Sequence, residues 1–235
     1  MLQLTPFLLM LAYGLLAYWF SAYRTARELD ARSTPLTDPE LRRQTDRLAI
    51  ALGVPQVKVF VYEIEPVNGL AAADGRIFLT RGFYQKFRDG LVTAEELASV
   101  IAHELGHVAL GHARRRVVDF SGQNAMRMVL AAVLNRVLPG VGALIANGLA
   151  SLLAARLSRQ DEFEADAYAA ALMTKAGLGT APQISLLRKL ALLTGGNATG
   201  PAWLLSHPET GQRIDAVEKL QARWANPPDR PPTRL

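Results

Sequence analysis

The sequence has no cysteine, and only four of its 235 residues are histidine. The lack of cysteine excludes disulfides, cysteine-ligated zinc, thiol catalysis and a lipid-modified cysteine anchor. Charged residues make up only 20% of the chain against 50% hydrophobic residues, a balance that disordered chains and coiled coils do not have. The length suffices for one domain with a hydrophobic core, alone or together with membrane segments.

Lysine and arginine, 26 in all, outnumber the 21 aspartates and glutamates. The resulting formal net charge of +5 favours an anionic partner. No motif of interleaved basic and aromatic residues supports nucleic acid, so no nucleic-acid partner is expected. Anionic membrane lipid fits better, because the chain also contains long apolar segments.

The first apolar segment opens the chain. Residues 2–20 carry no charged side chain, and aromatic residues gather at the far end of the segment. About 20 apolar residues cross a bilayer, and aromatic belts mark its edge. The pattern predicts a transmembrane anchor over residues 1–23. A cleaved signal peptide is the alternative, but a basic n-region is missing and bulky Phe20 lies near any plausible cleavage point.

Arginines follow this anchor at Arg24, Arg27 and Arg32, and no charged side chain precedes it. The positive-inside rule therefore favours a cytoplasmic position for the rest of the chain, at a membrane of the bacterial inner-membrane type. The bias is only a few charges, so the periplasmic side is the alternative.

Beyond the anchor we expect a linker at residues 24–38, a mainly helical α+β domain over residues 39–225 and a disordered tail at residues 226–235, which is rich in proline and charge. Periodicity and capping residues predict helices from Asp38 to about Leu52, from Thr93 to about Val118, and over Ser158–Lys175, Pro182–Leu193 and Glu209–Trp224. They predict strands over Val57–Tyr62 and Arg76–Thr80, with Asn68–Ala73 as a strand or an edge.

A second apolar segment, residues 124–157, is interrupted at Asn135–Arg136 and Pro139–Gly140. Each half is about a dozen residues long, too short to cross a bilayer alone. We expect a helical hairpin, either buried in the protein or in contact with the membrane. The arginines at 114–116, just before it, either complement a helix dipole or meet lipid phosphates.

Three of the four histidines lie within ten residues. His103-Glu104-Leu105-Gly106-His107 is an H-E-x-x-H motif on a predicted amphipathic helix. Positions four apart lie about 40° apart around a helix, so both imidazoles can bind one metal ion. Glu104 is placed to take a proton from a water that zinc activates. Coincidence in a surface helix is disfavoured, because this helix is capped and amphipathic as the chemistry requires.

A catalytic zinc needs a third protein ligand and an open position. The third histidine of the extended zincin motif is absent. His112 would lie about 140° beyond His107 on the predicted helix, facing away from the metal, and is expected to be structural or solvent-exposed. A carboxylate must then serve. Glu162 and Asp166 are four apart on one predicted helix face, so one can ligate while the other supports a histidine. From spacing alone, a solvated charged face is the alternative.

Several separated segments carry a resemblance to a known family. They are Asn68–Gly82, Glu96–His112, Ser158–Arg159 with Glu162, Ala165 and Asp166, and His207–Pro208 with Arg213–Ile214. In this order they resemble the HtpX-like and CAAX-prenyl-protease-like membrane-associated zinc metallopeptidases, which are gluzincins. The resemblance extends over roughly residues 39–220 and implies a zincin-like metallopeptidase domain with a small β-sheet.

The resemblance also implies a set of roles. It implies that His103, His107 and Glu162 bind one zinc ion per chain, that Glu104 is catalytic, and that Asp166 orients a zinc-binding histidine.

Three further residues matter to the family. The resemblance implies that Asn68 and its neighbours form an edge strand that receives the substrate backbone by β-addition. His207 is either a fourth ligand that blocks the resting site or a group that stabilises the oxyanion. Arg159 either holds a carboxylate or contacts the substrate backbone, and a structural salt bridge is its alternative.

Two features depart from the family. Gly69 replaces the usual alanine, and only one clear membrane span is visible where some relatives have four or more. No precise substrate and no isoprenyl-binding chamber are therefore carried over.

We expect a membrane-anchored zinc metalloendopeptidase that hydrolyses peptide bonds in misfolded or membrane-associated proteins during quality control; the last step is family analogy. The first alternative is a non-catalytic membrane chaperone or adaptor with a retained zinc site, which the intact Glu104 disfavours. A peptidase that stays inactive until His207 moves is the second. A DNA-binding basic protein, the third, lacks a supporting motif. Nothing in the sequence indicates an oligomeric state.

Overall fold

The computed structural model describes residues 20, 23–72, 74–112, 131, 133–136, 141–193, 207 and 210–225. The expected anchor, apart from Phe20 and Tyr23, lies outside these residues, as do the tail and much of the first half of the expected hairpin. In the part of the chain so described, no helix combines the length and the apolar character that crossing a membrane requires.

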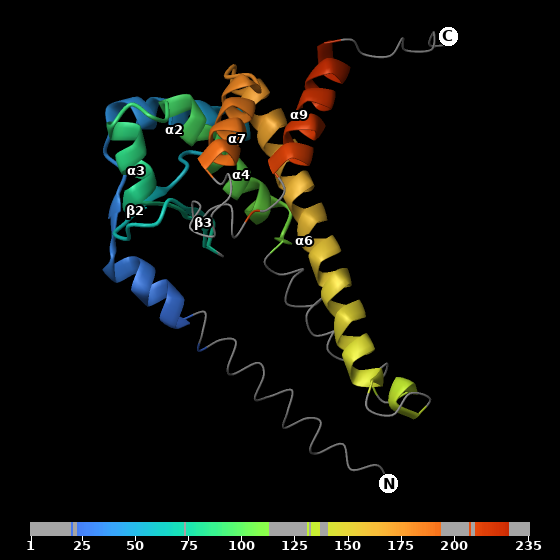
Figure 1. Cartoon of the computed structure of the whole chain (residues 1–235). Helices are drawn as coiled ribbons and strands as arrows, with labels where there is room; N and C mark the ends of the chain where they lie inside the picture. The colour runs from blue at the N-terminus through green and yellow to red at the C-terminus, as the bar shows by residue number, and fades with distance from the viewer. Residues whose placement is uncertain are drawn as a thin grey trace, which may run out of the picture.

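The described elements form a small mixed sheet and a set of helices (Figure 1). The strands are β1 (Ser33–Pro35), β2 (Val59–Tyr62), β3 (Gly69–Ala71) and β4 (Ile77–Thr80). The helices include α2 (Pro39–Leu52), α3 (Arg81–Arg88), α4 (Ala94–Ala109), α6 (Gly142–Lys175), α7 (Ala181–Leu193) and α9 (Thr210–Ala225). Residues 23–31 are also helical. The expected mainly helical domain with a small sheet is confirmed.

The sheet has the order β1-β2-β4-β3, so β3 lies at an edge. β2 and β4 are parallel, and the outer pairs are antiparallel. Strand β1 lies within residues 24–38, where we expected a linker, and there Ser33 pairs with Tyr62 and Pro35 with Phe60. Three residues that end in proline show no alternation, and only pairing with a distant strand makes them a strand.

Local capping signals gave the correct start of two helices. The Asp38 side chain accepts hydrogen bonds from the first turn of α2, which ends at Gly53 with a φ of 73°. Thr93 and Glu96 form a reciprocal capping box at the start of α4. Helix α3 was not predicted. Its Gly82 weakens the helical pattern, but a Cβ there would collide with the backbone of Glu65.

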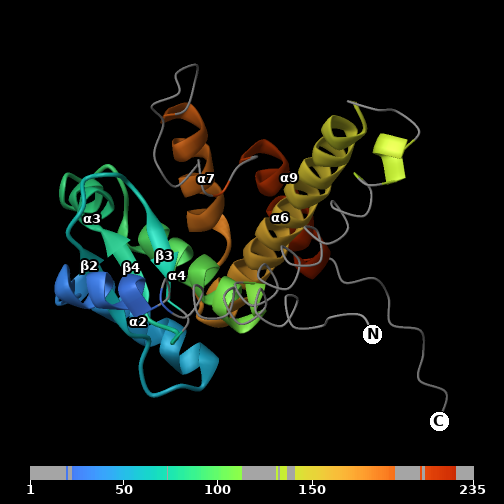
Figure 2. The same cartoon turned by 90° about the horizontal axis from the view of Figure 1, so that it is seen from below.

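Two predicted helix boundaries are wrong. Helix α4 ends at Ala109 instead of near Val118, because Gly111 takes a left-handed conformation with a φ of 66°. No helix begins at Ser158. Helix α6 runs without a break from Gly142 to Lys175, because neither glycine nor proline separates its apolar first half from its charged second half. The first half extends away from the sheet in both views (Figures 1 and 2).

Helix α4 lies at the centre of the domain and packs on α6, α2, α7 and β3. Its buried residues, together with those of the sheet and α2, form the main hydrophobic core; among them are Leu97, Ile101, Leu79, Leu41 and Leu48. Gly106 lets α4 approach α6 closely, since a Cβ there would lie 3.1 Å from both Cα and the carbonyl oxygen of Ala165. This contact sets the distance between the two helices that carry the polar cluster described below.

The capping box of α4 also holds α7. Buried Glu96 accepts hydrogen bonds from Thr93 N (2.9 Å), Ser185 Oγ (2.7 Å) and Lys189 Nζ (2.7 Å). Burial by itself raises the pKa of Glu96, but the hydrogen bonds from Lys189, Ser185 and Thr93 outweigh it and hold this pKa below its usual range.

We expect Glu96→Gln to lower the free energy of unfolding by about 1–2 kcal/mol at pH 7, because it removes a charge-assisted hydrogen bond from Lys189. The folded pKa of Glu96 is lower than the unfolded one, so its stabilisation is complete above about pH 4.3 and is lost as pH falls through the folded pKa. Urea unfolding of the two proteins should therefore differ at pH 7 and converge in acid.

Glu218→Gln is the matched control, because Glu218 pairs with Arg188 at the surface, where their side chains are 44% and 62% exposed. Such exposed pairs contribute about 0–1 kcal/mol. A Glu96→Gln difference that persists unchanged in acid would contradict the role of the ionised carboxylate.

Candidate metal centre

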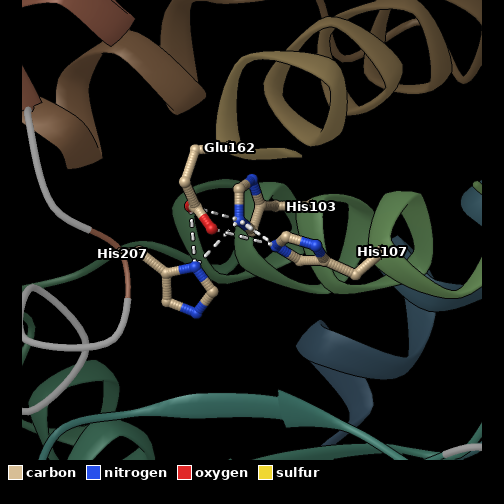
Figure 3. Close-up of side chains that lie close together, drawn as sticks. All are labelled: His103, His107, Glu162 and His207. Atoms are coloured by element: carbon tan, nitrogen blue, oxygen red, sulfur yellow. Dashed lines mark hydrogen bonds and ion pairs between the residues drawn. The ribbon is translucent and has the colours of Figure 1, made fainter. Parts of the chain in front are cut away.

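Helix α4 contributes two imidazoles to a buried cluster. His103 and His107 lie one turn apart and point to the same side of the helix (Figure 3). Their Nε2 atoms are 3.1 Å apart. The 16-residue helix is anchored by its capping box and by apolar packing on both sides, so the two rings are held by the fold and not by contact with each other.

Helix α6 and the segment before α9 complete the cluster. Glu162 Oε2 lies 3.4 Å from His103 Nε2, and Glu162 Oε1 lies 3.5 Å from His107 Nε2. His207 Nδ1 lies 2.7 Å from Glu162 Oε2 and 3.4 Å from His103 Nε2 (Figure 3). The four side chains are buried, and their donor atoms all lie within 4.8 Å of one another.

This spacing fits a metal ion. Donors at 2.0–2.1 Å from a tetrahedral ion lie about 3.3 Å from one another, and most of the distances between the donor atoms of this cluster are close to that value. Two imidazoles and a carboxylate are also a donor set that hydrolytic metal sites use. The structure therefore brings the sequence-predicted ligands His103, His107 and Glu162 together, with His207 as a fourth donor.

A second layer of contacts fixes His103 from behind. Its Nδ1 lies 2.9 Å from Asp166 Oδ1, one helical turn beyond Glu162 on α6. Arg213 on α9 donates through Nε and NH2 to both oxygens of Asp166, at 2.5 and 2.8 Å, and through NH1 to the carbonyl oxygen of His207, at 3.1 Å. Arg213 is fully buried. In the sequence, Arg213 stands out only as part of the Arg213–Ile214 motif, which predicted no role for it.

The electrostatics keep both carboxylates ionised. Burial raises the pKa of Asp166, but the charge and hydrogen bonds of Arg213 hold it well below its usual range. Burial likewise raises the pKa of Glu162, and hydrogen bonds from His103 and His207 reverse this effect. Each carboxylate therefore stays ionised and can accept a hydrogen bond from an imidazole N–H or bind a cation.

The two histidines of α4 differ. Burial alone lowers the pKa of His103, but its hydrogen bonds to Asp166 and Glu162 raise it to about 9. Burial, followed by the charge of His103, lowers the pKa of His107, which stays neutral. Only neutral imidazoles bind metal, so a metal ion displaces a proton from His103 when it binds.

Glu104 lies beside the cluster and not in it. Its side chain is buried, and among the described residues Oε1 has no hydrogen-bond partner. The Nε2 atom of His207 lies 3.5 Å from Glu104 Oε1. On the other side Glu104 faces the edge strand, where a Cβ added to Gly69 would lie 3.7 Å from Glu104 Cγ. The carboxylate is thus close to both the donor cluster and β3.

The remaining sequence-predicted site residues lie farther out. Asn68 precedes β3, and its Oδ1 accepts a hydrogen bond from Gly69 N at 3.0 Å. Arg159 is exposed on α6, three residues before Glu162, and its role stays a prediction.

His112 differs from its sequence prediction. It is buried, with 1% of its surface exposed, and its Nδ1 lies 2.7 Å from His107 Nδ1. The solvent-exposed alternative is therefore wrong. The prediction assumed that α4 continued past His112, whereas the turn at Leu110–Gly111 brings the ring back towards His107.

Comparison with known proteins agrees with this site. The profile of peptidase family M48 matches residues 35–221. The chain is similar to metalloprotease LoiP of Escherichia coli (strain K12), with 29% identity over 199 residues, or 83% of this chain and 76% of the relative. It is similar to protease HtpX of Pseudomonas aeruginosa (strain UCBPP-PA14), with 24% identity over 238 residues, covering 85% and 78%. It is also similar to CAAX prenyl protease 1 homolog of Oryza sativa subsp. japonica, with 27% identity over 231 residues, covering 82% and 50%.

We expect Asp166→Asn to weaken Zn²⁺ binding by about 10–100-fold, because His103 loses the carboxylate that orients its ring. Competition with a chromophoric chelator measures the affinity, and circular dichroism checks that the variant is folded. Asp215→Asn, the same change at an exposed position of α9, is the control. Equal affinities for the two variants would contradict the role of Asp166.

Proposed function

We propose that this protein binds zinc and cleaves internal peptide bonds of proteins at a membrane. The proposal starts from the family: the chain belongs to peptidase family M48 and is a metallopeptidase. The observation that carries the proposal is the convergence of His103, His107 and Glu162 beside the buried carboxylate of Glu104. A purely structural metal site would have no use for that carboxylate.

Zinc is the metal that fits these donors best. The set is two imidazoles and a carboxylate, in a buried position where the distances suit four-coordination. His103 and His107 would bind through Nε2 and Glu162 through a carboxylate oxygen. The bound ion supplies Lewis-acid chemistry, which makes water acidic enough to lose a proton near neutral pH and polarises a peptide carbonyl.

The chain's own residues perform the proton transfers. Glu104 accepts the proton of the attacking water and returns it to the nitrogen of the leaving amine. Burial holds the carboxylate in place beside the donor cluster, with Oε1 at 3.5 Å from His207 Nε2. Asp166 and Arg213 keep the ring of His103 in the orientation that the metal requires.

Edge strand β3 is the proposed support for the substrate backbone. Within the described part of the chain, β3 pairs with β4 on one side only, and its Gly69 lies against Glu104. A substrate segment that adds to this edge as a further strand, beginning near Asn68, brings a peptide carbonyl towards Glu104. Main-chain pairing of this kind suits protein substrates of varied sequence.

Two features support a membrane location. Residues 1–23 have the composition of an anchor. The first half of α6 has no charged residue from 142 to 155 and exposes Leu144, Leu149 and Leu152, which are 72%, 50% and 69% accessible. We place the catalytic domain on the cytoplasmic side because arginines follow the anchor. A tethered peptidase of this kind suits the removal of misfolded or membrane-associated proteins.

His207 is proposed to close the site at rest as a fourth ligand. Its Nδ1 belongs to the donor cluster, whereas its Nε2 lies near Glu104. A substrate carbonyl needs a coordination position, so His207 would have to move before hydrolysis. The alternative role, stabilisation of the oxyanion, needs the opposite order, with His207 approaching only once the substrate is bound.

The catalytic role of Glu104 is tested by Glu104→Gln. We expect one Zn²⁺ per chain in both proteins and a loss of casein hydrolysis by about 10²–10⁴-fold in the variant, because amide nitrogen cannot accept the proton. Glu95→Gln, the same change in the first turn of the same helix, is the control and should remain active. If both proteins bind zinc and neither cleaves, the site is either closed by His207, which His207→Ala tests, or belongs to a non-catalytic adaptor. Absence of bound zinc in the parent would refute the proposal.

The closing role of His207 is tested by His207→Ala. We expect hydrolysis of a short peptide to rise several-fold, because the variant leaves a coordination position open. Zinc content and initial rates are measured on the same preparation, so that a loss of metal is not mistaken for a loss of chemistry. A fall of about 10²–10³-fold with zinc retained would instead assign His207 to the oxyanion.

A further inference from the structure

His112 begins a chain of contacts that leads away from the donor cluster. Its Nδ1 lies 2.7 Å from His107 Nδ1, and its Nε2 lies 3.2 Å from Glu164 Oε2 and 3.8 Å from Asp161 Oδ1. Neither of these carboxylates belongs to the donor cluster around Glu162. His107 therefore has a buried partner, His112, on the side away from the cluster, as His103 has Asp166.

The residues in this chain of contacts come from two different parts of the fold. The turn at Leu110–Gly111 ends α4 and carries His112 back over His107. Helix α6 brings Glu164 from the other direction. Gln160 Nε2 donates to Glu164 Oε1 at 2.9 Å, so that Oε2 is the oxygen that meets His112.

The positions of the protons follow from these contacts. If His107 binds metal through Nε2, its neutral ring carries its only proton on Nδ1. That proton can be donated to His112 Nδ1 only if Nδ1 of His112 is bare. The single proton of neutral His112 then lies on Nε2, facing Glu164. In this arrangement each contact from His107 to His112 to Glu164 joins one hydrogen-bond donor to one acceptor.

A second metal ion is the competing reading, because His112, Asp161 and Glu164 also place donor atoms within 4.8 Å of one another. An ion on His112 Nε2 would force the proton of that neutral ring onto Nδ1. It would then face the proton on His107 Nδ1 across 2.7 Å, and two N–H groups directed at each other repel. Occupancy of the first site therefore disfavours an ion at the second.

We propose that His112 is a positioning residue that fixes the tautomer and ring orientation of His107 for zinc binding, with Glu164 as the acceptor behind it. This inference rests on the proposed zinc site and extends it to the second ligand. The two imidazoles of α4 are then supported differently, His103 by a carboxylate held by Arg213, and His107 by a neutral ring that passes its hydrogen bond on to a carboxylate.

The test compares His112→Leu with His112→Asn. Leucine removes the acceptor, and Zn²⁺ affinity measured by chelator competition should fall by about 10–100-fold. Asparagine can offer Oδ1 near the position of Nδ1, so its affinity should stay within about 5-fold of the parent. The visible spectrum of the Co²⁺-substituted proteins should change with leucine and be retained with asparagine.

Other outcomes separate the possibilities. If both variants lose thermal stability but the folded proteins bind Zn²⁺ like the parent, His112 is only structural and the positioning role is refuted, while the proposed zinc site stands. Two Zn²⁺ ions per parent chain, with one lost in His112→Leu, would replace the positioning role by a second metal site. A parent without zinc would refute both the proposed function and this inference.

Discussion

The close approach of α4 to α6 is the contact on which the site depends. Packed helix axes usually lie about 8–10 Å apart, with side chains between them. At Gly106 there is no side chain, and a Cβ would lie 3.1 Å from the backbone of Ala165. Each helix carries its polar pair one turn apart near this contact, His103 and His107 on α4 and Glu162 and Asp166 on α6. A larger residue at Gly106 would push α6 away from α4, and the carboxylates of α6 would then lie farther from the imidazoles of α4.

Such closeness also concentrates charge where water is scarce. Among the residues that the structure describes, Glu104, Glu162 and Asp166 are buried together, and the buried guanidinium of Arg213 faces them. With all four groups ionised, this set carries a net charge of −2, and burying net charge is costly. A divalent cation balances this number. In its absence a proton on His103 offsets part of the excess, in line with the raised pKa of that residue. The protein around the site is thus built for a bound cation.

The sequence predicted features that depend on neighbouring residues. The helix start at Asp38, the helix end near Leu52 and the helix start at Thr93 were correct because each depends on atoms within one turn. His103 and His107 were expected to share a helix face because they lie four residues apart on α4, whereas Glu162 reaches them through the packing of α6 on α4. The relation of β1 to β2, in contrast, is a pairing between distant segments, and three residues carry no period from which to read it.

Long-range contacts account for the other differences. Arg213 has no local signal, since its partner Asp166 lies 47 residues away. Gly106 and Gly111 look alike in the sequence, yet one stays helical and admits a neighbouring helix, while the other turns left-handed and ends α4. His112 follows the second glycine, so an angle calculated on a continuous helix pointed it away from His107. Because Gly111 adopts a left-handed conformation, His112 is a buried partner of His107 and not an exposed surface residue.

Arg213 also shows how the site can open without losing its form. Its Nε and NH2 groups bind Asp166, and its NH1 group binds the carbonyl oxygen of His207. If His207 closes the site as proposed, its departure breaks the NH1 contact and the contact with Glu162, but leaves the forked pair with Asp166 intact. His103 therefore keeps its supporting carboxylate while the fourth donor leaves. Because Nε and NH2 carry the pair with Asp166, and NH1 carries the contacts with the His207 carbonyl oxygen and, at 3.4 Å, with Glu162 Oε2, one buried arginine supports both the fixed and the movable part of the site.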